Sequence, residues 1–182
     1  MFDRKSLGLD ISTTHIGYVL FDREGEFELD GHIDISKIKN FNEKIRKVEL
    51  VLEDIILTEG TLNIFIEEYM KGFKKGKSSV QTMMKLAAMN VAVTYLCYSL
   101  NGMSDKYIHK LDVNSARTEL GIDYGKNVDT KAEVLYYVSN NEPKFSYENT
   151  IHGNPKVGTY DRADSWVIGK VGMIYEGKGY PE

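Results

Sequence analysis

The apolar residues near the N-terminus form two short runs, 6–11 and 16–22, separated by four small or polar residues. Runs of this length predict two strands joined by a tight turn. Residues 26–35 alternate in part between apolar and polar side chains, which predicts a third strand and completes an antiparallel meander. Asp10 lies inside the first apolar run, where an ionised carboxylate loses its hydration and needs a cation or strong hydrogen-bond donors.

The apolar spacing then changes from alternation to steps of three and four residues, which predicts a helix over residues 42–58 that ends at Gly60. Residues 61–69 form a short, branched, apolar run that ends in two acids. We expect this run to be a buried strand, paired in parallel with the first strand. The predicted helix carries one apolar stripe, formed by Ile45, Val48, Leu52, Ile55 and Ile56.

The second half of the chain predicts mainly helices. Ser78, followed three residues later by Gln81, matches a capping box, and Thr130 is the expected cap of a later helix. A mixed five-stranded sheet flanked by helices, an α/β fold in three layers, is therefore the expected architecture, as one domain over residues 1–182. The expected elements are a helix over 78–100, a strand over 106–111, helices over 113–121 and 130–140, a loop over 141–160, and a last helix from about 160 to 175.

The composition is that of an ordinary globular protein, with 42% hydrophobic and 27% charged residues in a chain of 182. The longest apolar stretch, residues 83–100, is interrupted by polar residues and falls short of the roughly 20 residues that span a bilayer. A single cysteine, Cys97, excludes a disulfide within the chain. We therefore expect a cytoplasmic protein with no membrane partner.

The net charge of −4 argues against a uniformly basic nucleic-acid binder, but the segment KGFKKGK at residues 71–77 holds four lysines and no acid. Local charge matters more than the sum to a phosphate backbone. This segment is therefore a candidate DNA contact, although a solvated loop with Tyr69 packed on a helix is the plainer alternative. The candidate DNA-binding residues are Tyr69, Lys71, Phe73, Lys74, Lys75 and Lys77.

Four acids occupy positions where carboxylates are costly: Asp10 and Glu67 in predicted buried strands, and Asp161 and Asp164 three residues apart on the last helix. Acids that gather in one place also raise each other's pKa. A hard divalent cation such as Mg²⁺ removes both penalties, because it prefers oxygen ligands and binds through carboxylates and phosphate. The alternatives are that Asp161 is a helix cap and that Glu67 and Glu68 form a solvated pair.

Three short motifs together resemble the RuvC family of Holliday-junction endonucleases, within the RNase H-like superfamily. The first is Asp10 followed by a small-residue turn and Gly17-Tyr18; the second is Ile66-Glu67; the third is Asp-x-Ala-Asp from Asp161 to Asp164. Their order and spacing agree across nearly the whole chain. Usage of Lys, Ile, Asn and Tyr suits a bacteriophage protein, which would place the activity in the host cytoplasm.

The resemblance implies that Asp10, Glu67, Asp161 and Asp164 bind two Mg²⁺ ions, with Mn²⁺ as a substitute, for hydrolysis of a phosphodiester. It also implies a homodimer that acts on four-way junctions and other branched DNA. Lys131 matches a functional lysine of the family. A second family lysine has no counterpart at the expected place, and Arg117 and Lys110 are its possible replacements.

Three alternatives remain open at this point. An RNase H-type nuclease that cleaves RNA–DNA hybrids would use the same acids. A DNA-binding module with an inactive site is a second alternative, although all four acids are present. A kinase of the actin-like fold shares the first motif, but it needs two such domains, and Ser12 replaces its expected glycine.

Overall fold

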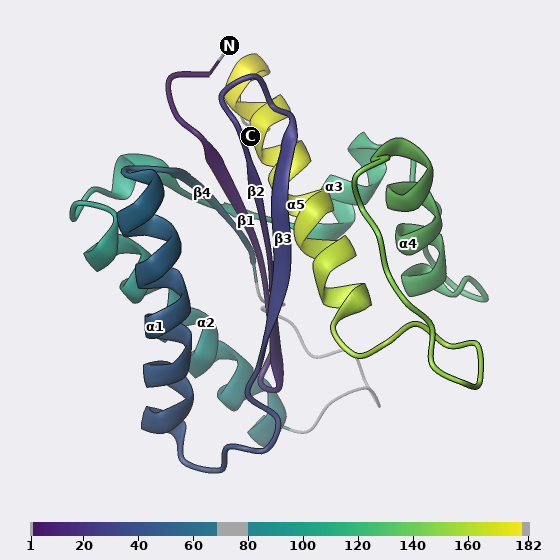
Figure 1. Cartoon of the computed structure of the whole chain (residues 1–182), viewed down its shortest axis with the longest axis horizontal. Helices are drawn as coiled ribbons and strands as arrows, with labels where there is room; N and C mark the ends of the chain where they lie inside the picture. The colour runs from purple at the N-terminus through teal and green to yellow at the C-terminus, as the bar shows by residue number, and fades with distance from the viewer. Residues whose placement is uncertain (1, 69–79, 180–182) are drawn as a thin grey trace.

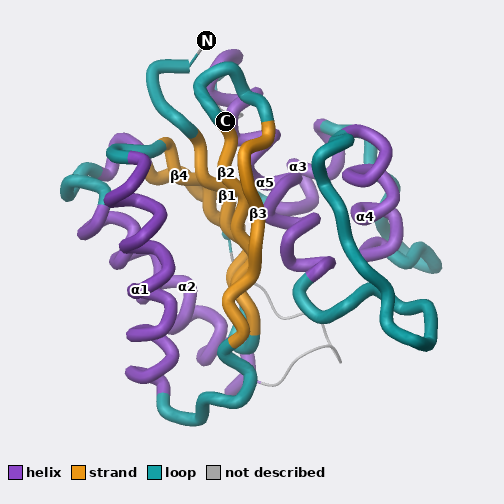
Figure 2. Tube along the Cα trace, viewed as in Figure 1, coloured by secondary structure: helices purple, strands orange, loops and turns teal. Residues whose placement is uncertain are grey.

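Five strands form one mixed sheet with helices on both faces, as Figures 1 and 2 show. The structure is a computed structural model and describes residues 2–68 and 80–179. The strand order is β3-β2-β1-β4-β5. The strands are β1 (Ser6–Ile11), β2 (His15–Phe21), β3 (Phe27–Asp34), β4 (Asn63–Glu67) and β5 (Ile108–Leu111).

The pairing of β1 confirms the predicted meander and the predicted parallel neighbour. β1 is antiparallel to β2, which is antiparallel to β3, and it is parallel to β4 on its other side. Leu9 lies opposite Ile66 in the parallel pair, and Asp10 lies opposite Gly17 in the antiparallel pair. All six residues of β1 are buried, as expected for a strand at the centre of a sheet.

Two layers of helices enclose the sheet. Figure 1 shows α1 (Phe41–Glu59) and α2 (Val80–Leu100) on one side, and α3 (Val113–Glu119), α4 (Thr130–Asn141) and α5 (Thr159–Lys178) on the other. A short 3₁₀ turn, Asp105–Tyr107, leads into β5. Each side of the sheet has its own apolar core, one against α1 and α2 and one centred on α5.

The cap of α4 differs from the sequence prediction, and the alternative that Asp161 caps the last helix is wrong. Asp129, rather than Thr130, caps α4, because its side chain accepts a hydrogen bond from the amide of Ala132. α5 begins at Thr159, two residues before Asp161, and its cap is Gly158 in a left-handed conformation (φ 86°). Asp161 is therefore not a cap, and its carboxylate lies in the first turn of α5. The predicted capping box of α2 cannot be compared, since Ser78 lies outside the described residues.

Glycines let α5 lie directly on the sheet. A Cβ atom added to Gly8 of β1 would lie 2.3 Å from the carbonyl oxygen of Ser165 and 2.7 Å from the amide nitrogen of Gly169. A Cβ added to Gly17 of β2 would lie 2.0 Å from the carbonyl oxygen of Asp161. All three distances are far shorter than ordinary van der Waals contact. The close approach fixes the beginning of α5 over the C-terminal end of β1.

α2 has two apolar faces. Met89, Val93 and Cys97 are buried against the sheet and α1. On the opposite face, apolar side chains recur at steps of seven and four and stay open to solvent: Met84 is 67% exposed, Val91 57% and Tyr95 66%.

By length and by its mean hydropathy of 1.2, α2 would be long enough and apolar enough to cross a membrane, so the sequence expectation that no stretch approaches this length was too strict. The core helix of a soluble protein passes the same test, and 28% of this stretch is buried. Among the residues that the structure describes, no other helix passes it.

Replacing Gly8 with alanine is expected to lower the free energy of unfolding by about 1–3 kcal/mol, because the new methyl group meets backbone atoms of α5 that cannot rotate away. Urea unfolding followed by circular dichroism measures this change. Gly177→Ala is the matched control on α5, since nothing lies within 4 Å of its added Cβ. Equal unfolding midpoints for Gly8→Ala and Gly177→Ala would contradict the close packing of α5.

Candidate active site

Parallel pairing of β1 and β4 brings two acids to the same end of the sheet. Leu9 and Ile66 are partners, so Asp10 and Glu67 come next in the same register. Side chains alternate between the faces of a sheet, and Gly8 faces α5; Asp10, two residues later, therefore also faces α5. Asp10 is 9% exposed, and Glu67 ends its strand in a half-buried position.

The first two turns of α5 bring the other two acids to Asp10. Gly17 is the partner of Asp10 across β1 and β2, and the backbone of Asp161 lies against Gly17. Asp164 is three residues further along α5 and is 7% exposed. Residues from three separate parts of the chain thus meet at one place, at the C-terminal ends of β1 and β4.

The pKa of Asp10 records this crowding. Burial raises the pKa of Asp10 well above its ordinary value of 3.8. The charge of Glu67 and a hydrogen bond with its side chain raise this pKa further, and the charges of Asp164 and Asp161 add to the effect. All four predicted acids therefore belong to one electrostatic group.

Arg117 of α3 provides a cation at the buried end of this group. Its guanidinium donates a hydrogen bond of 3.1 Å to Oδ1 of Asp164, and the two side chains are 14% and 10% exposed. Burial raises the pKa of Asp164, and the charge and hydrogen bond of Arg117 oppose that rise. The Nε of Arg117 is buried and has no hydrogen-bond partner among the described residues.

Arg117 and Lys110 were the two possible replacements for the missing family lysine, and they lie on different sides of the sheet. Lys110 directs its amine toward α2, where it lies 3.4 Å from Oδ1 of Asn90. Arg117 contacts one of the candidate acids directly. The local sequence does not distinguish these two residues, because the ion pair joins positions 47 residues apart.

Lys131 lies near the same acids, at the start of α4. Its side chain is exposed, and its Nζ lies 5.6 Å from the centre of the Tyr160 ring. Its charge lowers the pKa of Asp164, although burial keeps the net shift upward. The amine of Lys131 therefore lies on the solvent side of the four acids.

The donor atoms suit a hard divalent cation, since all four acids offer carboxylate oxygens. As the side chains stand, no group of three or more His, Cys, Asp or Glu residues in the described part of the chain is arranged to hold a metal ion. In this arrangement Arg117 pairs with Asp164, and Asp10 and Glu67 interact with each other. Metal binding by these residues therefore stays a prediction.

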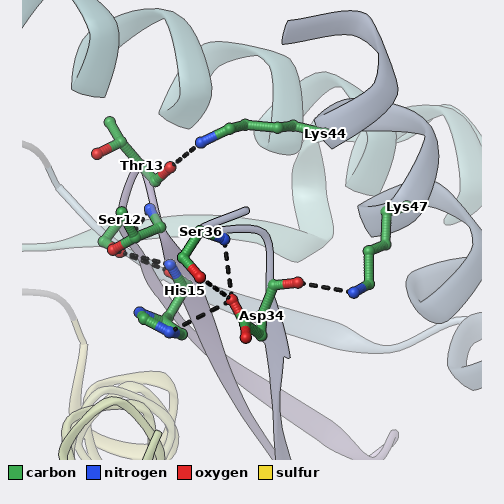
Figure 3. Close-up of polar contacts among 8 residues, drawn as sticks. Ser12, Thr13, His15, Asp34, Ser36, Lys44 and Lys47 are labelled. Carbon is green, nitrogen blue, oxygen red and sulfur yellow. Dashed lines mark hydrogen bonds and ion pairs between the residues drawn. The ribbon is translucent and has the colours of Figure 1, made fainter. Parts of the chain in front are cut away.

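The turn that follows Asp10 is held by a hydroxyl and a lysine. The Oγ of Ser12 accepts hydrogen bonds from the amides of Thr14 (3.2 Å) and His15 (2.9 Å) and donates one to the carbonyl of His15 (2.7 Å). Lys44 of α1 donates a hydrogen bond to the carbonyl oxygen of Thr13, as Figure 3 shows. Small polar residues are thus needed here to close the turn.

The six candidate DNA-binding residues between positions 69 and 77 lie outside the described residues, so their role stays a prediction. They are Tyr69, Lys71, Phe73, Lys74, Lys75 and Lys77. The predicted catalytic residues, by contrast, all lie in described segments.

The raised pKa of Asp10 predicts how stability depends on pH. As the pH rises above 3.8, the unfolded chain releases this proton first, because the folded state retains it to a higher pH. The free energy of unfolding is therefore expected to fall with rising pH until the pKa of the folded state is passed. Asp10→Asn removes this loss and is expected to unfold at a higher urea concentration than the wild type, at neutral pH in a chelator.

The measurement is a series of urea midpoints from acidic to neutral pH. Asp123→Asn is the control, because Asp123 is an exposed carboxylate. A variant Asp10→Asn that follows the wild-type curve at every pH would contradict the crowded, buried environment of Asp10.

Comparison with known proteins identifies the fold. No protein-family model and no curated protein sequence matches the chain. RuvC of T. thermophilus in complex with a Holliday junction substrate matches with a TM-score of 0.70 and 13% identity, over 96% of each chain. A Thermus thermophilus RuvC structure gives a TM-score of 0.63 and 14% identity, again over 96% of each chain.

The yeast mitochondrial Holliday junction resolvase Ydc2 matches with a TM-score of 0.57 and 12% identity, over 95% of this chain and 79% of its own. Identities this low establish shared architecture. Together with the sheet order and the helices on both faces, they confirm the fold expected from the sequence. The chain has the RNase H-like α/β fold of RuvC-type resolvases.

Proposed function

We propose that this protein is a metal-dependent endonuclease that nicks four-way junctions and other branched DNA. The observation that carries the proposal is that β1, β4 and α5 bring four carboxylates to one end of the sheet, where burial and the other three acids raise the pKa of Asp10. Four crowded carboxylates, two of them buried, are unfavourable unless cations bind them, and phosphodiester hydrolysis is a reaction that such cations serve. The match to RuvC bound to a Holliday junction supports DNA as the substrate.

Asp10, Glu67, Asp161 and Asp164 are the proposed ligands of two Mg²⁺ ions, which Mn²⁺ could replace. Bound there, the ions would activate a water molecule and stabilise the leaving oxygen of the phosphodiester. The strands hold Asp10 and Glu67 on a rigid support, and α5 carries Asp161 and Asp164. This arrangement orients the carboxylate oxygens before substrate arrives.

Two basic side chains lie beside the acids and have different proposed roles. Lys131 is exposed beside Tyr160 and lies near enough to Asp164 to lower its pKa. We assign it contact with the scissile phosphate, where an amine stabilises negative charge that develops in the transition state. Arg117 orients Asp164 through their buried ion pair.

A homodimer would let one molecule cut two symmetric strands of a junction. The open apolar face of α2, with Met84, Val91 and Tyr95, is the proposed interface, because burying it removes apolar surface from water. The opposite face of the same helix packs on the sheet, so α2 would be covered on both sides in the dimer.

Asp10→Asn is expected to bind a synthetic four-way junction as tightly as the wild type and to nick it at least about 10³-fold more slowly, because it loses one metal ligand. Wild-type protein with Mg²⁺ is expected to give paired nicks, and none in a chelator. The measurement combines gel-shift titration with denaturing electrophoresis of the labelled strands.

Glu68→Gln is the matched control, since it removes the carboxylate next to Glu67 and leaves the four proposed ligands in place. Linear duplex and an RNA–DNA hybrid are the comparison substrates. Faster cleavage of the hybrid would favour the RNase H-type alternative, and junction binding without cleavage would favour an inactive binding module. Normal cleavage by Asp10→Asn would refute the site.

Val91→Glu is expected to raise the dissociation constant of the dimer by about 100-fold or more, because it buries an unpaired charge at the proposed interface. Sedimentation velocity measures the change. Leu57→Glu is the control, because Leu57 on α1 is an equally open apolar side chain (68% exposed) outside that face. A wild type that sediments as a monomer at every concentration would contradict the proposed dimer.

A further inference from the structure

A second basic segment lies far from the predicted lysine loop in the sequence. Residues 37–47, KIKNFNEKIRK, contain five basic residues and one acid, in a chain whose net charge is −4. The segment joins β3 to α1 and forms the first turns of α1. It therefore concentrates positive charge at one place on the side of the sheet that α1 and α2 cover.

A cavity of about 350 Å³ opens beside this segment. Three lysines line it: Lys39 from the connection between β3 and α1, Lys44 of α1 and Lys85 of α2. Ile38, Phe41 and Met89 make its apolar lining, and Thr13 of the turn after β1 closes one side. No acid lines this cavity, so the three amines are not neutralised within it.

The three lysines are not equivalent. Lys44 is fixed, because its amine donates a hydrogen bond to the carbonyl oxygen of Thr13, as Figure 3 shows. Lys39 and Lys85 make no hydrogen bond or ion pair with any residue that the structure describes. These two amines are thus available to a ligand, whereas the amine of Lys44 holds the turn after β1 through Thr13.

The chemistry of the lining fits a sugar–phosphate backbone. Ammonium groups attract phosphates without regard to sequence. The apolar side chains of Phe41 and Met89 in the lining would accept the C–H surface of deoxyribose. A polyanion that presents both kinds of surface satisfies the whole cavity better than a small inorganic anion does.

The position of the cavity adds a geometric constraint. Thr13 follows Asp10 by three residues, so the cavity and the acids lie at the same end of β1. Asp10 faces α5, whereas Met89 belongs to the core on the side of α1 and α2. A straight duplex lying along the acids contacts one side of the sheet, while a branched DNA sends a second arm in another direction.

We propose that the cavity between Lys39 and Lys85 binds the backbone of a second arm of branched DNA, outside the catalytic site. The inference rests on the proposed function. It names Lys39 and Lys85 as residues by which the protein prefers branched over linear DNA. Lys39 and Lys85 contact phosphates of the arm that is not cut, and Lys44 keeps the turn after Asp10 in place beside them.

The test is the double variant Lys39→Ala, Lys85→Ala, with binding measured in a chelator at salt concentrations from about 50 to 200 mM. The slope of log affinity against log salt is negative, and each lost phosphate contact makes it shallower by about 0.9. The slope for a four-way junction is therefore expected to become about 1.8 less negative, while that for linear duplex stays at the wild-type value.

Lys106→Ala, Lys178→Ala is the matched control, because it removes the same charge at the beginning of β5 and the end of α5, away from the cavity. Urea midpoints equal to wild type verify that both double variants fold. An unchanged junction slope in the cavity variant, with wild-type protein still nicking junctions, overturns this inference and leaves the proposed function intact.

An equal loss of slope for junction and linear duplex also overturns it, since the cavity would then contact the same arm as the acids. If the cavity variant shows the expected change in junction slope but the wild type never nicks junctions, the result supports the cavity and refutes the nuclease. A wild type that binds no branched DNA refutes both.

Discussion

The close contact between α5 and the central strands is the constraint on which the site depends. At Gly8 and Gly17 there is no room for a side chain, because backbone atoms of α5 occupy the place where a Cβ would stand. A helix at the usual distance from a sheet would carry Asp161 and Asp164 away from Asp10. The absence of two methyl groups thus decides where two carboxylates lie.

Electrostatics work against the arrangement that packing imposes. Burial and neighbouring charges raise the pKa of Asp10 and of Asp164, so each ionised carboxylate carries a cost. The protein offsets part of this cost with Arg117, which is buried, and with Lys131, which is exposed. Other parts of the molecule follow the usual rule, with opposite charges in contact, as in the ion pair of Arg162 with Asp30 at 2.6 Å.

Much of the architecture follows from local patterns. The meander, the parallel pairing of the strand that ends in Glu67, and the helix stopped by Gly60 were predicted because hydrophobic spacing and glycine act over a few residues. The cap of α4 was assigned to Thr130 because Thr130 and Asp129 are adjacent and both are residue types that favour this position. The choice between Arg117 and Lys110, and the cavity that unites Lys39 with Lys85, depend on contacts between distant segments, which no local pattern contains.

The ion pair between Arg117 and Asp164 makes the guanidinium a resident counterion. Because the chain itself supplies this positive charge, the carboxylate group can assemble during folding before any ion arrives from solution. Removing a charge from such a buried pair typically costs about 3–5 kcal/mol, so Arg117 also contributes to the integrity of the fold. Folding of this part of the protein therefore does not depend on a cation taken up from solution.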